Sequence, residues 1–417
     1  MHIAVLGALT ALLAGVLLSR PDVIAVGLPL ALWAVRSFTR IGVGAVSAVG
    51  VRIERVGDAE DGPLLDEIVI DSDAEMVEVA VIQAERIRRR VFVPSRARLR
   101  SSVRPLHSGP LVTVEAAVRT LDADAGSLGA PQPAAAAMRA VRPLPRRLPR
   151  LPLAPRLTGL HGAHEGVRQG QGGDFRDIHA FAPGDELRRV DWRATARAAR
   201  RPDELFVRRT NSLSDASAVI MMDTADDLGA VVATWGRAAP DRSGVTSLDH
   251  ARSAARSIAE ATIAQGDRVA FHSLAHGGRS VRSGGGRRQL ARLVAEISAC
   301  GRGGDDARFR RTPPVPHGSI IYMLSTFFDG AAAELAMRWR ASGHRVVAVD
   351  TLPELDRGRL TLERDLALRV LLDEREDMLQ QLRDAAVETV RWSSEGIDGA
   401  LAALARIPGA LPTGRRR

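Results

Sequence analysis

The chain has 417 residues, of which 45% are hydrophobic and 26% are charged, and these values exclude a wholly disordered protein. Aromatic residues make up only 4%, so the stacking platforms that bind single-stranded nucleic acid are poorly supplied. The net charge is +9 with arginine as the basic residue throughout, which we attribute to a GC-rich genome, and the single cysteine excludes disulfide frameworks and Cys-rich zinc sites within one chain.

Two apolar runs open the chain, at 3–18 and 23–35, and a short polar segment with Arg20 and Pro21 separates them. Each run is shorter than the roughly 20 residues of a comfortable transmembrane helix, although tilt or local bilayer thinning accommodates short helices. We predict a transmembrane hairpin over 1–40, held in the lipid bilayer. A cleaved signal peptide and a buried soluble hairpin are the alternatives. Arginines gather after the second run, so the positive-inside rule predicts a two-span protein of the cell (inner or plasma) membrane whose soluble domains face the cytoplasm.

Residues 47–120 alternate apolar and polar side chains in segments such as EIVIDS and PLVTVEAAVRTL, which is the period of half-buried strands. Gly and Pro turn signals separate these segments at short intervals. We therefore predict a small antiparallel β-sandwich. Residues 121–157 follow as a linker rich in Pro, Arg and Ala, in which proline favours an extended backbone. Its arginines either lie on anionic lipid or stay solvated.

A dense polar block, GDFRDIHAFAPGDELRRVDWRATAR, lies near the start of the last predicted domain, 158–410. It contains a Pro-Gly turn, then alternating acids and bases and one tryptophan. Asp185, Glu186 and Asp191 can pair with the arginines in a self-contained ionic network, which would brace the entry to the next sheet. The alternative is a surface that docks an anion or a partner. The arginines in question are Arg188, Arg189, Arg193 and Arg197.

Apolar strand-like segments alternate with amphipathic helical segments after residue 215. This order predicts a parallel, Rossmann-type α/β sheet with helices on both faces. Ligand sites in such sheets lie at the carboxyl ends of the strands, where Asp223, Ser325, Asp329 and Asp350 would fall. The expected strands are 216–223, 268–274, 319–325, 345–351 and 388–393, and the expected helices are 247–265, 287–299, 331–341 and 397–406.

The polar block resembles the signature of the domain of unknown function 58 family. In that family a Gly-Glu/Asp-Phe segment leads to Tyr-x-Pro-Gly-Asp-Asp-x-Arg-x-Ile-Asp-Trp-x-x-x-Ala-Arg and then to Val-Arg-Glu. Phe181 and Glu186 stand where the family often has Tyr and Asp, and Arg209 replaces the last acid. The positions that match the signature are Phe175, Arg176, Pro183, Gly184, Asp185, Arg188, Asp191, Trp192, Ala196, Arg197 and Arg208.

The resemblance also extends to the layout of the chain and implies a function. Proteins of this family have a two-helix hairpin, a β-rich segment, the signature and then a von Willebrand factor A-like domain. They are commonly associated with MoxR-type AAA+ ATPases in chaperone-like maturation systems. The resemblance therefore implies such an ATPase as partner, with the signature residues as a docking surface or as a structural brace.

A von Willebrand factor A-like fold implies a test for its metal site, whose oxygen ligands suit Mg²⁺. The complete site uses Asp-x-Ser-x-Ser, a Thr on a second loop and an Asp on a third. Here Asp223 is present, but Ala225 and Asp227 replace the serines, and Thr326 stands where the last acid is expected. Asp226, Asp227 and Asp329 could still form an irregular carboxylate site. We expect these acids to be satisfied by backbone N–H groups or arginine, and we expect no cofactor, with Mg²⁺ as the alternative.

Other features of the last domain give weaker signals. The glycines at 284–286 precede a helix and could hold an anion, but they lack the Lys-Ser/Thr of a P-loop. His161 and His164 could chelate a metal, although their Gly-flanked segment favours an exposed turn. Cys300 has no arranged base in the local sequence. Leucines form a stripe within 354–385, which is typical of a core-facing helix, with partner binding as the alternative.

These patterns favour a membrane-anchored, non-enzymatic adaptor or assembly protein that works with a MoxR-type AAA+ ATPase. The second hypothesis is a metal-dependent hydrolase or ligand-binding module that uses Asp223, Asp227 and Asp329. Nucleic-acid binding is a third idea, which we do not expect because acids are interleaved with the arginines.

Overall fold

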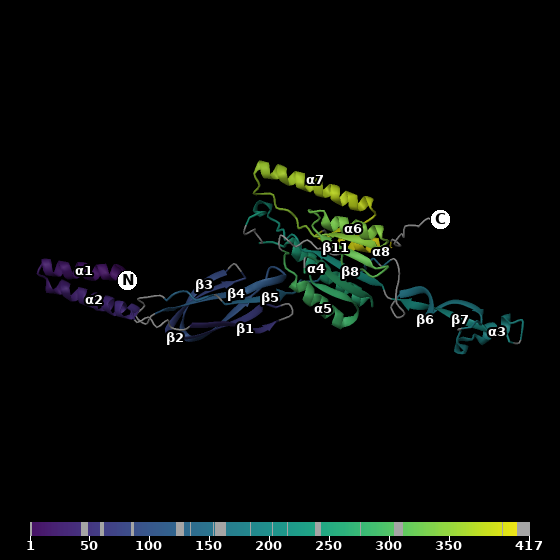
Figure 1. Cartoon of the computed structure of the whole chain (residues 1–417), viewed down its shortest axis with the longest axis horizontal. Helices are drawn as coiled ribbons and strands as arrows, with labels where there is room; N and C mark the ends of the chain where they lie inside the picture. Colours follow the sequence, from purple (N-terminus) through teal and green to yellow (C-terminus); the bar gives the residue numbers. More distant parts are fainter. Residues whose placement is uncertain are drawn as a thin grey trace. The chain divides into compact units, whose positions relative to one another are not determined.

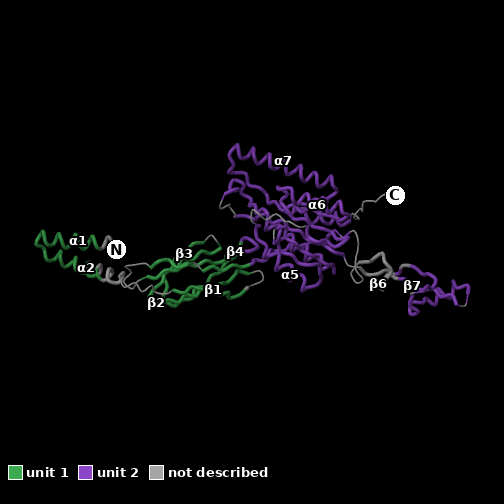
Figure 2. The backbone as a smooth tube through the Cα atoms, in the orientation of Figure 1, with its two compact units in different colours: residues 1–105, 111–139 green, residues 106–110, 140–417 purple. Residues whose placement is uncertain are grey.

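Two compact units divide the chain (Figure 2). Unit 1 comprises residues 1–105 and 111–139, and unit 2 comprises residues 106–110 and 140–417. The computed structural model describes residues 2–42, 49–58, 62–84, 87–121, 129–133, 135–152, 154, 164–183, 185–201, 203–214, 216–237, 243–275, 277–303, 312–393 and 395–406.

The first two helices, α1 (His2–Leu17) and α2 (Pro21–Gly42), form a helical hairpin. At about 1.5 Å per residue, the 16 residues of α1 extend about 24 Å, less than the roughly 30 Å hydrocarbon core of a bilayer. Helix α2 is longer but has an acid, Asp22, in its first turn, contains Pro29 and includes arginines near its end. Among the described helices, none is both long and apolar enough to span a membrane. The predicted transmembrane hairpin, and with it the two-span localisation in the cell membrane, is therefore wrong.

The described strands of the first unit form one sheet, not the predicted sandwich of two. Strand β2 (Leu64–Gln83) pairs along most of its length with β3 (Ile87–Val103), in antiparallel register. On its other edge, the first half of β2 pairs with β1 (Val49–Asp58) and the second half pairs with β4 (Gly109–Leu121). Strand β5 (Ala135–Val141) lies beside β4, within the segment predicted as a linker.

A six-stranded sheet lies at the centre of unit 2 (Figure 1). Its neighbouring strands β9, β8, β11, β12 and β13 run parallel, and β10 pairs with β9 in antiparallel register at one edge. The strands, in spatial order, are β10 (Ser280–Gly284), β9 (Arg268–Leu274), β8 (Ser217–Asp223), β11 (Ile320–Ser325), β12 (Arg345–Asp350) and β13 (Glu388–Arg391).

Helices cover both faces of this sheet because its strands are apolar on both sides. Ile220 and Met222 of β8 pack with one group of helices, whereas Val219 and Met221 pack with the other. The first group is α4 (Ser247–Ala264), α5 (Gly286–Ala299) and α8 (Ile397–Arg406), and the second is α6 (Ala331–Ala341) and α7 (Leu362–Asp384).

The predicted fold class fails as a whole, since it combined a transmembrane hairpin, a sandwich and a parallel Rossmann-type sheet. No described helix can span a membrane, and the strands that the structure describes in the first unit form one antiparallel sheet. Among the strand pairs whose register is described, five are antiparallel and four are parallel. All four parallel pairs lie in the six-stranded sheet, among β9, β8, β11, β12 and β13.

A separate two-stranded ribbon precedes the six-stranded sheet in the chain. Strands β6 (His164–Ala180) and β7 (Phe206–Ser214) pair in antiparallel register with several register shifts. The connection between them contains the short 3₁₀ helix η1 (Leu187–Arg189) and the helix α3 (Trp192–Ala198). A further 3₁₀ turn, η2 (Val232–Thr234), lies between β8 and α4. Most of the signature block is therefore the end of this ribbon.

Candidate functional site

The connection from β6 to β7 is folded back onto β7 by backbone hydrogen bonds. The N–H of Phe181 donates to the carbonyl of Leu205 at 2.7 Å, and the N–H of Asp191 donates to the carbonyl of Phe206 at 2.8 Å. Val190 forms an isolated bridge with Val207, and both side chains are buried. These contacts fix the position of the connection on β7, so its outer side chains are presented on a defined surface.

The acids of the signature are bound mainly to the backbone of the connection. Asp191 is the N-cap of α3 and accepts from the N–H of Ala194 at 3.0 Å. Asp185 accepts from the N–H of Ala182 at 2.9 Å and lies 3.4 Å from His179. Glu204 accepts from the N–H of Arg200 at 2.7 Å. Each of these carboxylates satisfies a backbone donor that a loop would otherwise leave exposed.

The predicted ionic network forms only in part. Glu186 pairs with Arg188 at 2.5 Å and with Arg189 at 3.3 Å, and the hydrogen bond from Arg188 lowers the pKa of Glu186. Asp185 and Asp191, which we expected to hold arginines, bind backbone N–H groups instead. The prediction failed because a turn and a helix N-terminus supply nearby N–H donors, which compete with arginine for these acids.

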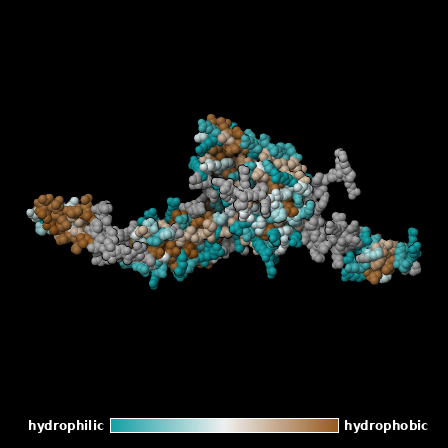
Figure 3. All heavy atoms as spheres, viewed as in Figure 1, coloured by the Kyte–Doolittle hydropathy of each residue, from teal (hydrophilic) through white to brown (hydrophobic). Residues whose placement is uncertain are grey.

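The outer face of α3 is exposed and carries a tryptophan and two arginines. Trp192 has 69% of its surface exposed, and Arg193, Ala196 and Arg197 are exposed beside it. The hydroxyl of Thr195, on the opposite side of the helix, accepts from the N–H of Phe206 and faces β7. Figure 3 shows apolar side chains among hydrophilic ones at this end of the ribbon. Its exposed large apolar side chains are Phe175, Ile178, Phe181, Leu187 and Trp192.

The remaining signature residues take different places. Arg208 of β7 lies over the ring of Phe175, with its guanidinium carbon 5.3 Å from the ring centroid. Pro183 is exposed in the turn after β6. Gly184 and the side chain of Arg176 lie outside the described residues. The signature therefore joins a cation–π contact on the strands to the exposed face of α3.

Asp223 lies at the carboxyl end of β8, as predicted, but is bound within the protein. Its Oδ2 accepts from the hydroxyl of Ser325 at 2.7 Å, and its Oδ1 accepts from the N–H of Ala225 at 3.0 Å. Burial raises the pKa of Asp223 to about 6, against the lowering effect of these two hydrogen bonds. Charge on Asp226 and Asp329 raises it further. The carboxyl ends of β8 and β11 thus form a local acidic edge.

The other acids at this edge do not complete the metal site that we tested for. Burial raises the pKa of Asp226, and the charge of Asp329 adds to this effect. Asp329 accepts from the N–H of Ala331 at the start of α6. Within the described part of the chain, Asp223, Asp227 and Asp329 belong to no cluster of three or more acidic, His or Cys side chains that could hold a metal ion.

Asp350, at the carboxyl end of β12, is held by a buried arginine of α7. Arg375 lies 2.5 Å from an oxygen of Asp350, and its Nε donates to the carbonyl of Thr326 at 2.6 Å. Its guanidinium also lies over the ring of Phe328. Phe327 lies between Thr326 and Phe328 in the loop that follows β11, and it has a φ of 57° and a buried side chain. Arg375 therefore ties α7 to the ends of two strands.

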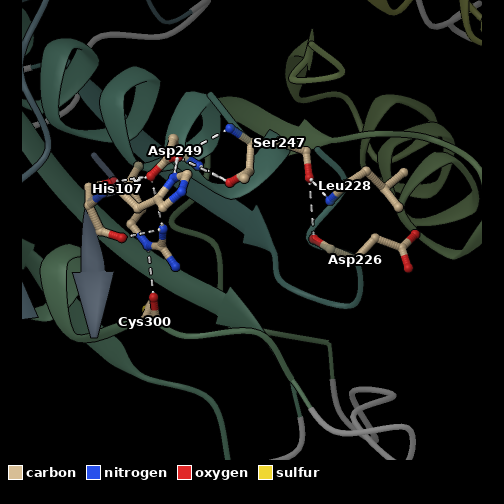
Figure 4. A network of polar contacts seen from close by, with 9 residues as sticks. His107, Asp226, Leu228, Ser247, Asp249 and Cys300 are labelled. Carbon is tan, nitrogen blue, oxygen red and sulfur yellow. Dashed lines mark hydrogen bonds and ion pairs between the residues drawn. The ribbon is translucent and has the colours of Figure 1, made fainter. Parts of the chain in front are cut away.

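A polar network that the sequence did not indicate surrounds the first turn of α4 (Figure 4). Asp249 completes a capping box with Thr246 and also accepts from His107 Nδ1 at 2.7 Å and from the N–H of Ser108 at 2.8 Å. Arg252 donates to the carbonyls of Ser108 and Cys300. The network thereby fastens residues 106–110 to α4 within unit 2.

The same helix turn reaches toward the acidic edge. The hydroxyl of Ser247 accepts from the N–H of Leu228 at 2.9 Å and lies 3.5 Å from the carbonyl of Asp226 (Figure 4). The sequence could not reveal the contact between His107 and Asp249, because these residues are 142 positions apart. The local S/T-x-x-D/E pattern of Thr246 and Asp249 was the one available signal.

The weaker predicted sites are placed as follows. Gly286 has a φ of 79° at the start of α5, and Gly285 is the N-cap of that helix. Cys300 is buried, and this burial raises the pKa of its thiol to about 11. His161 and the side chain of His164 lie outside the described residues.

A known protein family matches the part of the chain that contains α3 and the acidic edge. The family model for the protein of unknown function DUF58 matches residues 177–363. Over this stretch the chain is similar to the DUF58 family. The DUF58 match begins in β6 and extends to the first turn of α7, so it includes the connection with α3 and the acidic edge. Among curated proteins, none matches the chain. The von Willebrand factor A-like assignment and the ATPase partner stay predictions.

Proposed function

We propose that this DUF58 protein is a non-enzymatic adaptor that binds its partner through the outer face of α3. The partner we propose, following the family resemblance, is a MoxR-type AAA+ ATPase that acts in protein maturation or complex assembly. One observation carries the proposal: the signature uses its acids to build a fixed connection and leaves Trp192, Arg193 and Arg197 exposed on it.

Tryptophan and arginine are the residues most enriched at the energetic centres of protein interfaces. An exposed tryptophan on a helix that is fixed to a strand loses little conformational entropy on binding. The acids at the carboxyl edge support an adaptor as well, because Asp223 and Asp350 are bound by Ser325 and Arg375 of the same chain. Their described contacts are those of structural groups.

The test is affinity capture of the tagged full-length chain from its native host, with ATP and without it, read by mass spectrometry. We expect nucleotide-dependent recovery of an AAA+ ATPase with the wild-type chain and a loss of about tenfold or more with Trp192→Ala. Phe92→Ala is the matched control, since Phe92 is an exposed aromatic residue of β3, 57% exposed. Capture of no ATPase would refute the proposed partner, and equal capture by both variants would refute the docking face.

A further inference from the structure

The outer face of α3 has two stripes that run side by side along the helix. Trp192 and Ala196 are four residues apart and form an apolar stripe, and Arg193 and Arg197 form a basic stripe next to it. All four side chains are exposed, whereas Ala194 and Thr195 are half-buried toward β7. The face therefore has a defined polarity across its width.

The basic stripe continues past the end of the helix. Arg200 and Arg201 are exposed like Arg193 and Arg197. In the described part of the chain, none of these four arginines has a salt bridge or a side-chain hydrogen bond. Three nearby acids are already engaged, Asp191 and Glu204 by backbone N–H groups and Glu186 by Arg188. The net charge that this face presents is thus more positive than the composition of the segment suggests.

We infer that the partner surface bound by α3 is an acidic protein surface, with carboxylates opposite Arg193 and Arg197 beside an apolar depression that receives Trp192. This inference rests on the proposed function, because it specifies the partner of the same face. Charge complementarity requires the partner surface to be negative, since desolvated arginines at an interface need anionic counterparts. The apolar stripe of Trp192 and Ala196 additionally requires an apolar surface on the partner, beside its carboxylates.

A continuous polyanion fits this face less well than a protein does. Asp177 and Asp203 are exposed on the same ribbon, and a phosphate backbone that tracked along the arginines would approach these acids. Discrete carboxylates on a protein can be placed opposite the arginines alone. An amphipathic acidic segment also offers the apolar strip that Trp192 and Ala196 require.

The test uses the full-length chain and a synthetic peptide of about 15 residues, made of Leu at helical spacing and Glu elsewhere. We expect the peptide to bind the wild-type chain, and Arg193→Glu/Arg197→Glu or Trp192→Ala to weaken binding about tenfold or more. The matched control is Arg288→Glu/Arg292→Glu on α5, two exposed arginines with the same spacing and the same change in charge. This control should leave binding unchanged.

Several outcomes would overturn the inference. These are no peptide binding, equal binding of a Leu–Lys peptide, or a stronger dependence on these arginines for a random DNA duplex or for phosphatidylglycerol vesicles. Thermal unfolding of each variant confirms that the fold is intact. ATPase capture that needs Trp192 without peptide binding rejects this inference and leaves the proposed function. Peptide binding without ATPase capture rejects the proposed ATPase partner and keeps the acidic specificity.

Discussion

Asp249 gives a residue-scale prediction about stability and pH. Burial alone would raise its pKa, but hydrogen bonds from His107, Ser108 and Thr246 outweigh burial and lower the pKa to about 2. The unfolded value is near 3.8, so the charged form stabilises the fold by about 2 kcal/mol above pH 4, and this contribution is lost as the pH falls toward 2.

We therefore expect Asp249→Asn to lower the free energy of unfolding of unit 2 by about 2 kcal/mol at pH 7. The difference from wild type should shrink below about pH 3. Urea denaturation across this pH range measures it, with Asp377→Asn, at an exposed position of α7, as control. A difference that stays constant down to pH 2 would contradict the assignment.

The raised pKa of Asp223 predicts the opposite dependence of stability on pH. Burial raises its pKa to about 6, so the folded state holds a proton that the unfolded state releases near 3.8. Stability should consequently decrease as the pH rises from about 4 to 6, by roughly 1–3 kcal/mol. Asn keeps the acceptor for the N–H of Ala225, and Asp223→Asn should raise the melting temperature at pH 7 and flatten this dependence. A lower melting temperature at pH 7 would show that the carboxylate is needed.

At the residue scale, sequence reasoning predicted positions better than partners. It placed Asp223 and Asp350 at strand ends, where both are found. It assigned arginines to Asp185 and Asp191, which bind backbone N–H groups. Partner choice depends on which donors the folded loop brings within about 3 Å, and composition does not contain that information.

Helix α7 gives a prediction at the scale of an element. Arg375 is buried and neutralises Asp350, so Arg375→Met would leave that carboxylate buried near a weaker partner, Arg391 at 3.9 Å. We expect a loss of about 3 kcal/mol in the free energy of unfolding. Arg369→Met removes an exposed pair with Asp365 and should cost less than about 1 kcal/mol. Equal losses in both variants would contradict the anchoring role of Arg375.

The same helix shows the limits of periodicity. The leucine stripe predicted a core-facing helix, and Leu368, Leu379 and Leu382 are indeed buried. Leu362 and Leu366 are exposed, by 75% and 51%, whereas Leu379 and Leu382 pack into the core on one face of the six-stranded sheet. Strands with continuous apolar runs, such as β8 and β11, were located correctly within one or two residues.

The ribbon of β6 and β7 was missed as an element. Its first strand is rich in Gly and polar residues, and it lacks the β-branched alternation that marks a strand. Pairing with β7, which lies beyond α3, determines its conformation. The apolar content of α1 and α2 was read correctly, but the length and charge of the helices exclude the predicted spans.

The whole molecule should unfold in two steps because each unit has its own core. Val79 is fully buried in the sheet of unit 1, and Leu293 is fully buried between α5 and the six-stranded sheet. Val79→Ala should lower the free energy of unfolding of unit 1, and Leu293→Ala that of unit 2, each by about 2–4 kcal/mol. Each variant should therefore shift one calorimetric transition to lower temperature and leave the other in place. A single transition that both variants shift equally would show that the units unfold together.

The placement of residues 106–110 in unit 2 has a consequence for synthesis on the ribosome. The chain leaves unit 1 at residue 105, contributes five residues to unit 2 and returns at residue 111. His107 is translated 142 residues before Asp249, an interval of roughly 7–30 s at about 5–20 residues per second. During that interval β3 and β4, on either side of His107, can each pair with β2, whereas Asp249 has not yet been translated. The nascent chain of unit 1 therefore contains five residues of unit 2, which can bind α4 only after that helix has been translated.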